Sequence, residues 1–130
     1  MLGTYALSAG YRDRYYASAQ EARRRITTEL LGAFNDVDAI VGPVSPTTAF
    51  ELGERVSDPL AMYLSDVFTV PVNLAGTAAV SVPCGVTPGG LPVGMQVVVN
   101  RFDEPTMFAV AGSIERGCGG PLAPPQRGAA

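Results

Sequence analysis

The chain has 130 residues, of which 47% are hydrophobic and 16% charged, and its formal net charge at pH 7 is −3. This length suits one ordinary domain with its own core, and no apolar run reaches the roughly 18 residues that a membrane-spanning helix needs. The N-terminus also lacks the basic, apolar and small-residue regions of a secretory signal, so we predict a cytoplasmic protein without membrane contact.

Histidine and lysine are both absent, and all 9 basic residues are arginine. A serine nucleophile needs a neighbouring group that takes up a proton near neutral pH, and arginine stays protonated there. We therefore assign no catalytic residue, and we predict structural roles in turns and strands for Ser45, Ser65 and Ser81. The acidic residues are scattered, which does not favour chemistry by paired carboxylates.

The two cysteines and the arginine cluster have plain structural interpretations. Cys84 and Cys118 lie far apart and no histidine accompanies them, so we predict two reduced thiols, with Cys84 packed as a small side chain, and no metal site. The negative net charge argues against a nucleic-acid-binding face. The one basic cluster, residues 23–25, falls in a predicted helix and suits a solvated face.

The first half of the chain predicts a helix, a strand and a long connection. Apolar residues recur at steps of three and four from Tyr15 to Phe34, which indicates an amphipathic helix ending near residues 35 and 36. The β-branched run at 38–44 predicts a buried strand. Residues 42–59 then form an irregular connection of the length seen in functional loops or larger assemblies.

The second half predicts two helices around a hairpin. Asp58 before Pro59 marks the start of a short helix over 59–66, and Pro71 favours an extended Val70. Two β-type stretches, 79–86 and 91–99, predict an antiparallel hairpin with prolines at edges or bulges. The last predicted helix begins at an Asp103 cap, ends at Gly117 and carries the apolar stripe Met107, Val110, Ala111 and Ile114. The expected fold class is α/β, a mixed sheet flanked by helices.

Asp66 is the single carboxylate inside an apolar run, "MYLSDVFTVPVNLAG". Burying an unpaired carboxylate costs several kcal/mol, which is on the order of the stability of a whole domain. Either the backbone satisfies the charge, through an Asx turn in which the carboxylate accepts from the N–H groups of Phe68 or Thr69, or a ligand does.

Several motifs of the chain occur in the order known from one family. They are "MLGTYALSAGY", "VGPVSPTTAF", "DPLAMYLSDVFTVPVNLAG", "VSVPCGV" and "GLPVGMQ" with "FDEPT". Residues 1 to about 116 thereby resemble the C-terminal part of the amidase signature family. Within that family the likeness is to the A subunits of aspartyl/glutamyl-tRNA amidotransferases.

The resemblance implies a subunit that hydrolyses glutamine. The ammonia would pass to a partner subunit that uses ATP and Mg to amidate misacylated Glu-tRNA(Gln) or Asp-tRNA(Asn), in a complex with B- and C-type subunits. This chain would hold no cofactor itself. The acid that matches Asp66 is expected to bind the α-ammonium group of the glutamine substrate, with Asn73 near the same pocket.

The resemblance also bears on what the chain lacks. The serine nucleophile, second serine and lysine of the family lie upstream of the region that this chain resembles, which accounts for the missing lysine and predicts a chain that is inactive alone. Met1 corresponds to an internal methionine of the family. We therefore expect a fragment, with 1–116 as the C-terminal portion of the amidase-signature domain and 117–130 as a disordered tail rich in Gly, Pro and Ala.

Two alternatives stay open at this point. One is a fragment of a general amidase that acts on another amide. The other is a non-catalytic α/β module for ligand binding or interaction that retains the scaffold without the chemistry.

Overall fold

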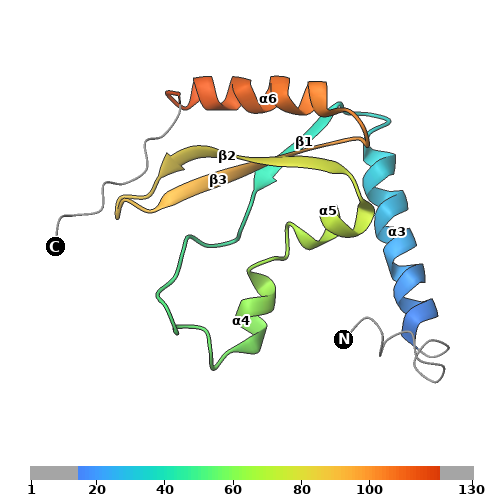
Figure 1. Ribbon diagram of the computed structural model, residues 1–130, viewed down its shortest axis with the longest axis horizontal. Coiled ribbons are helices and arrows are strands. Elements are labelled where there is room, and N and C mark those ends of the chain that lie inside the picture. The colour runs from blue at the N-terminus through green and yellow to red at the C-terminus, as the bar shows by residue number, and fades with distance from the viewer. Residues whose placement is uncertain (1–14, 121–130) are drawn as a thin grey trace.

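The helices and strands follow one another in the order shown in Figure 1. The computed structural model describes residues 15–120. In chain order the elements are α3 (Ala17–Ala33), β1 (Ala39–Pro43), α4 (Pro59–Leu64), α5 (Val70–Ala75), β2 (Ala78–Val86), β3 (Pro92–Val99) and α6 (Glu104–Gly117). The α/β class, the long first helix, the hairpin and the last helix are confirmed. Of the predicted tail, residues 121–130 lie outside the described residues.

The three strands form one antiparallel sheet in the order β1-β3-β2. The β2–β3 hairpin changes register between Pro83 and Gly85, and Pro92 is the first residue of β3. Pro83 thus lies at a bulge, as predicted, and Pro92 at a strand end, where a proline is also tolerated. β1 lies at an edge and pairs with β3 alone, which leaves Val41 52% exposed. The prediction of a buried strand at this place is wrong, because the sheet gives β1 a single neighbour. The predicted mixed pairing is not found among residues 15–120, where both strand pairs are antiparallel.

The apolar core lies where α6 crosses one face of the sheet (Figure 1). Its buried members are Val82, Val97, Val99, Met107 and Ala111, and Val110 and Ile114 pack against them. The predicted stripe of the last helix therefore faces the sheet. The predicted cap is also confirmed, since the Asp103 carboxylate accepts a hydrogen bond from the Thr106 N–H at 3.4 Å.

α4 and α5 are two short helices separated by a turn. The Asp58 cap is confirmed, because its carboxylate accepts from the Ala61 N–H at 3.0 Å. α4 ends at Leu64, two residues earlier than predicted, and Val70 begins α5 where the sequence predicted extended backbone. That prediction is wrong because Pro71 occupies the first turn of α5. Main-chain N–H groups in that turn have no partner within the helix, so the missing N–H of proline breaks no hydrogen bond there.

Two arginines from distant parts of the chain hold the C-terminal end of α5. The Arg23 guanidinium of α3 donates to the Leu74 carbonyl at 2.8 Å. Arg101, which follows β3, donates to the carbonyls of Ala75 and Gly76. Cations stabilise the unpaired carbonyls at a helix C-terminus, so these contacts attach α5 to both α3 and the sheet. The neighbouring arginines at 24 and 25 pair with Glu21 on the exposed face of α3.

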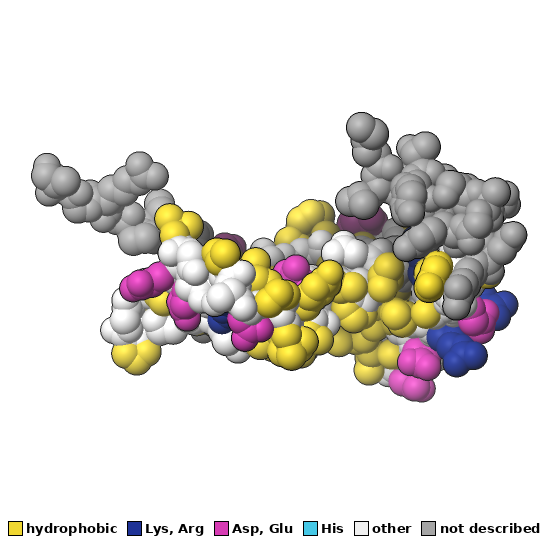
Figure 2. Space-filling view, turned by 90° about the horizontal axis from the view of Figure 1, so that it is seen from below, with side chains coloured by type: hydrophobic (Ala, Val, Ile, Leu, Met, Phe, Trp, Pro, Cys, Tyr) yellow, Lys and Arg dark blue, Asp and Glu magenta, His cyan; other side chains and the backbone are white. Residues whose placement is uncertain are grey.

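The side of the molecule that carries α4 and α5 exposes many large apolar side chains. Figure 2 shows hydrophobic side chains gathered over the middle of this face. Among those between residues 50 and 74, the most exposed are Leu52, Val56, Leu60 and Tyr63, with exposed fractions of 105%, 84%, 67% and 81%. Within residues 15–120, no helix combines the length and the hydropathy that a membrane span requires.

Candidate functional site

The turn at residues 65–69, which we call the Asp66 turn, joins α4 to α5. Its backbone closes on itself, because the Asp66 main-chain oxygen accepts from the N–H groups of Thr69 at 3.1 Å and Val70 at 3.0 Å. The Thr69 hydroxyl donates to the same oxygen at 3.3 Å. The Asp66 carbonyl thus satisfies N–H groups at the start of α5, which a helix cannot satisfy internally.

The Asp66 side chain is exposed, and its carboxylate forms no hydrogen bond or ion pair with the described part of the chain. The Asx-turn alternative is wrong, since the Thr69 N–H donates to the main-chain oxygen of Asp66 and not to its carboxylate. The expected cost of burial is absent too, because residues 15–120 leave this side chain at the surface. The turn therefore presents a surface carboxylate that is free, within residues 15–120, to accept hydrogen bonds from a ligand.

Arg55 ties the connection after β1 to the first residue of the Asp66 turn. Its guanidinium donates to Ser65 Oγ at 2.7 Å and to Thr47 Oγ1 at 3.0 Å. The same group lies over the Phe50 ring, 4.1 Å from the ring centroid, a cation–π arrangement. These contacts, together with a hydrogen bond to the Ala61 carbonyl at 3.5 Å, hold the guanidinium and, through it, Ser65.

Gln96 ties the other end of the turn to the sheet. Its amide nitrogen donates to the main-chain oxygens of Phe68 and Pro43, both at 3.1 Å. Gln96 lies on β3, the central strand, directly opposite Gly42 on β1 and Ser81 on β2. Residues that pair directly share one face of a sheet, so the two small neighbours leave room for the amide. Neither Gln96 nor Arg55 was predicted from the sequence as a site residue.

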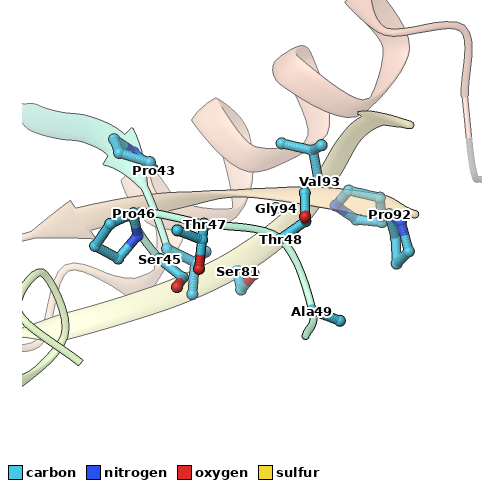
Figure 3. A pocket seen from close by; sticks show the side chains of 12 residues that line it. Pro43, Ser45, Pro46, Thr47, Thr48, Ala49, Ser81, Pro92, Val93 and Gly94 are labelled. Carbon is cyan, nitrogen blue, oxygen red and sulfur yellow. The ribbon is translucent and has the colours of Figure 1, made fainter. Parts of the chain in front are cut away.

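An open groove of about 670 Å³ lies between the connection after β1 and the ends of β2 and β3 (Figure 3). Proline rings and the hydroxyl side chains of Ser45, Thr47, Thr48 and Ser81 form much of its wall. No lining residue is charged. A site of this kind contacts uncharged parts of a ligand.

Two smaller hollows share wall residues with the groove on one side and with the Asp66 turn on the other. One, of about 180 Å³, has Ser81 in common with the groove and is also lined by Thr69 and Asn73. The other, of about 270 Å³, has Thr47 in common with the groove and is also lined by Ser65. Ser65 and Thr69 are the two ends of the turn, so Asp66 lies between the hollows along the chain.

The remaining candidate residues have structural surroundings. Ser65 Oγ donates to the Ala61 carbonyl at 3.0 Å as well as accepting from Arg55. The Cys84 thiol donates to the Val93 carbonyl at 3.5 Å from a half-buried position. Both cysteines are unpaired, and Cys118 is exposed. Residues 15–120 contain no group of three or more potential metal ligands.

The fold and the sequence place the chain in a family. The model of the amidase family matches residues 1–108, so the chain belongs to the amidase family. A crystal structure of an amidase shares 28% sequence identity and a TM-score of 0.69, over 89% of this chain and 27% of that one. The predicted family is thereby confirmed.

Relatives with higher sequence identity than this amidase share one name. The A subunit of glutamyl-tRNA(Gln) amidotransferase from Geobacter metallireducens is 56% identical over 116 residues, which are 89% of this chain and 24% of the relative. The crystal structure of the protein of this name from Thermotoga maritima has a TM-score of 0.77 and 45% identity, over 95% of this chain and 26% of that one. The chain therefore spans about a quarter of the length of the relatives that it matches.

Proposed function

We propose that the chain forms part of the glutamine-binding pocket in the A subunit of a tRNA-dependent amidotransferase, and that the Asp66 carboxylate binds the α-ammonium group of glutamine. The observation that carries the proposal is the Asp66 carboxylate, which has no partner within residues 15–120 and lies on an internally bonded turn. It occurs in a chain that is 56% identical to the glutamyl-tRNA(Gln) amidotransferase relative over 116 residues.

The proposed contact is a charge-assisted hydrogen bond. Such bonds are about twice as strong as bonds between neutral groups and are worth about 1.5–3 kcal/mol when a charged partner is involved. The ammonium group does not react when the side-chain amide of glutamine is cleaved. Asp66 would therefore bind substrate and transition state alike, which lowers KM without raising kcat.

The chemistry of the proposed subunit is amide hydrolysis, in which glutamine and water give glutamate and ammonia. This chain has no histidine or lysine, so it supplies no base that activates a hydroxyl. We assign the serine nucleophile, the second serine and the lysine to a part of the subunit beyond the matched quarter. The ammonia would pass to a partner subunit that uses ATP and Mg to form Gln-tRNA(Gln) or Asn-tRNA(Asn), in a cytoplasmic complex with B- and C-type subunits.

The test uses a chimeric subunit, in which residues 1–116 replace the matching 24% of the Geobacter metallireducens protein, together with the partner subunits of that relative. We expect the chimera to release ammonia from glutamine, and the 130-residue chain alone to release none above background. Asp66→Asn should raise KM for glutamine about 10- to 100-fold and leave kcat nearly unchanged, since it removes one charge-assisted contact. Asp36→Asn, at an exposed turn after α3, is the matched control.

Three experimental results would each contradict the proposal or one part of it. A chimera that hydrolyses a simple aliphatic amide but not glutamine would support a general amidase and contradict the proposal. An Asp66→Asn chimera with an unchanged KM would remove Asp66 from the binding site. Ammonia release by the 130-residue chain alone, sensitive to a serine-directed inhibitor, would contradict the assignment of the catalytic groups to another part of the subunit.

A further inference from the structure

The Asp66 turn cannot hold its own position. It lies between two helices of six residues each, and helices of this length are unstable by themselves in water. The hydrogen bonds inside the turn fix its shape but not its place in the molecule. Contacts from other segments must therefore determine where the carboxylate points.

We infer that Gln96 and Arg55 are positioning residues for glutamine binding, which hold the Asp66 turn at both ends. This inference rests on the proposed role of Asp66. Arg55 holds Ser65, the residue before Asp66, and Gln96 holds Phe68, two residues after it. Neither side chain needs to touch the substrate.

Gln96 is suited to this role by its place on the sheet. β3 has a partner strand on each side, so its backbone is the best fixed of the three strands. One amide nitrogen carries two hydrogens and donates one to Phe68 and one to Pro43, residues that are 28 and 53 positions away in sequence. A glutamate at this place has no such donors, and its charge would face two carbonyl oxygens.

Arg55 is suited to its role by the shape of the guanidinium group. Two of its nitrogens donate to hydroxyl groups from different segments, Ser65 on one side and Thr47 on the other, while its plane lies over Phe50. A lysine ammonium is a compact charge and does not reproduce this fork and stacking together. Arg55→Lys thus keeps the positive charge but loses the combination of the two hydrogen bonds with the stacking on Phe50.

The test measures glutamine hydrolysis by the chimera carrying Gln96→Glu, Gln96→Met or Arg55→Lys. We expect each change to raise KM for glutamine about tenfold, equal to about 1.4 kcal/mol, with kcat within about twofold of the parent because the reacting groups are elsewhere. Gln20→Glu and Arg25→Lys make the same chemical changes on the exposed face of α3 and should leave KM unchanged.

A substrate without the α-amino group separates positioning from general damage. With glutaramate, the amide acid that lacks this ammonium, the three variants should equal the parent, because Asp66 then has nothing to bind. In an Asp66→Asn background the same changes should add little to KM. Hydrogen exchange of peptides over residues 62–76 should become faster in the variants while the other peptides stay as in the parent.

The results distinguish this inference from the proposed function. If Asp66→Asn leaves KM unchanged, the proposed function fails. If Asp66→Asn raises KM but the Gln96 and Arg55 variants do not, or if they lower kcat equally for glutamine and glutaramate, the positioning role is overturned. Faster exchange throughout the chimera in the Gln96→Met and Arg55→Lys variants would likewise assign these residues to overall stability alone.

Discussion

Met107 provides the sharpest test of how α6 packs on the sheet. Its side chain is 6% exposed and belongs to the core cluster. Met107→Ala removes roughly three methylene-sized groups, at about 0.8 kcal/mol each. The cavity left behind adds to this, so we expect a loss of about 3 kcal/mol in the free energy of unfolding, within the range of about 2–5 kcal/mol for such changes. Because a domain is stable by only about 5–15 kcal/mol, the loss is easily measured.

The assay is urea unfolding of the 130-residue chain followed by circular dichroism. At a urea dependence of about 1.5 kcal/mol per M, the midpoint should fall by about 2 M. Phe108→Ala is the matched control, since Phe108 is the next residue of the same helix and is 63% exposed. It removes more atoms but should cost less than about 0.5 kcal/mol. A larger loss for Phe108→Ala than for Met107→Ala would refute the assigned face of α6.

Two further predictions concern backbone conformation and exposed surface. Gly76→Ala should lower the free energy of unfolding by about 1 kcal/mol or more, because Gly76 has φ 67° and an L-residue is strained there. Gly32→Ala, inside α3, should instead raise it by up to about 1 kcal/mol, because the new Cβ meets no atom within 4 Å other than the local backbone of its own helix. Equal effects in differential scanning calorimetry would contradict the assigned conformations. The 130-residue chain should also bind a hydrophobic dye, and Tyr63→Ser with Val56→Ser, at positions 81% and 84% exposed, should lower the dye fluorescence. A monodisperse chain that binds no dye would contradict this last prediction.

The predictions that succeeded rest on signals between residues close in sequence. Asp58 and Asp103, each followed within two residues by a proline, mark the two helix starts that the structure confirms. The hairpin follows from two β-type runs around a Gly-rich turn. In each case the interaction that decides the conformation spans a few residues, so the sequence alone contains it.

The predictions that failed depend on which segments meet. Pro71 indicated a break, but the Asp66 carbonyl accepts from the Val70 N–H and starts a helix there. The β-branched run of β1 indicated burial, but strand order decides which strand has a single neighbour. Gln96 is the one amide in an apolar strand, and that exception could have drawn attention to it. Nothing local connects it to Phe68, 28 positions away.

The order of the amino acids was enough to establish the class of fold, most of the helices and strands, the family and the lack of a base that could activate serine. Those features depend on residue types and short spacings. The folded chain was needed to show that the Asp66 carboxylate has no partner in the described part of the chain, and that Arg55 and Gln96 contact the turn on either side of it. These are contacts between segments remote in sequence, and only the packing of the sheet, the long connection and the two short helices brings them within hydrogen-bonding distance.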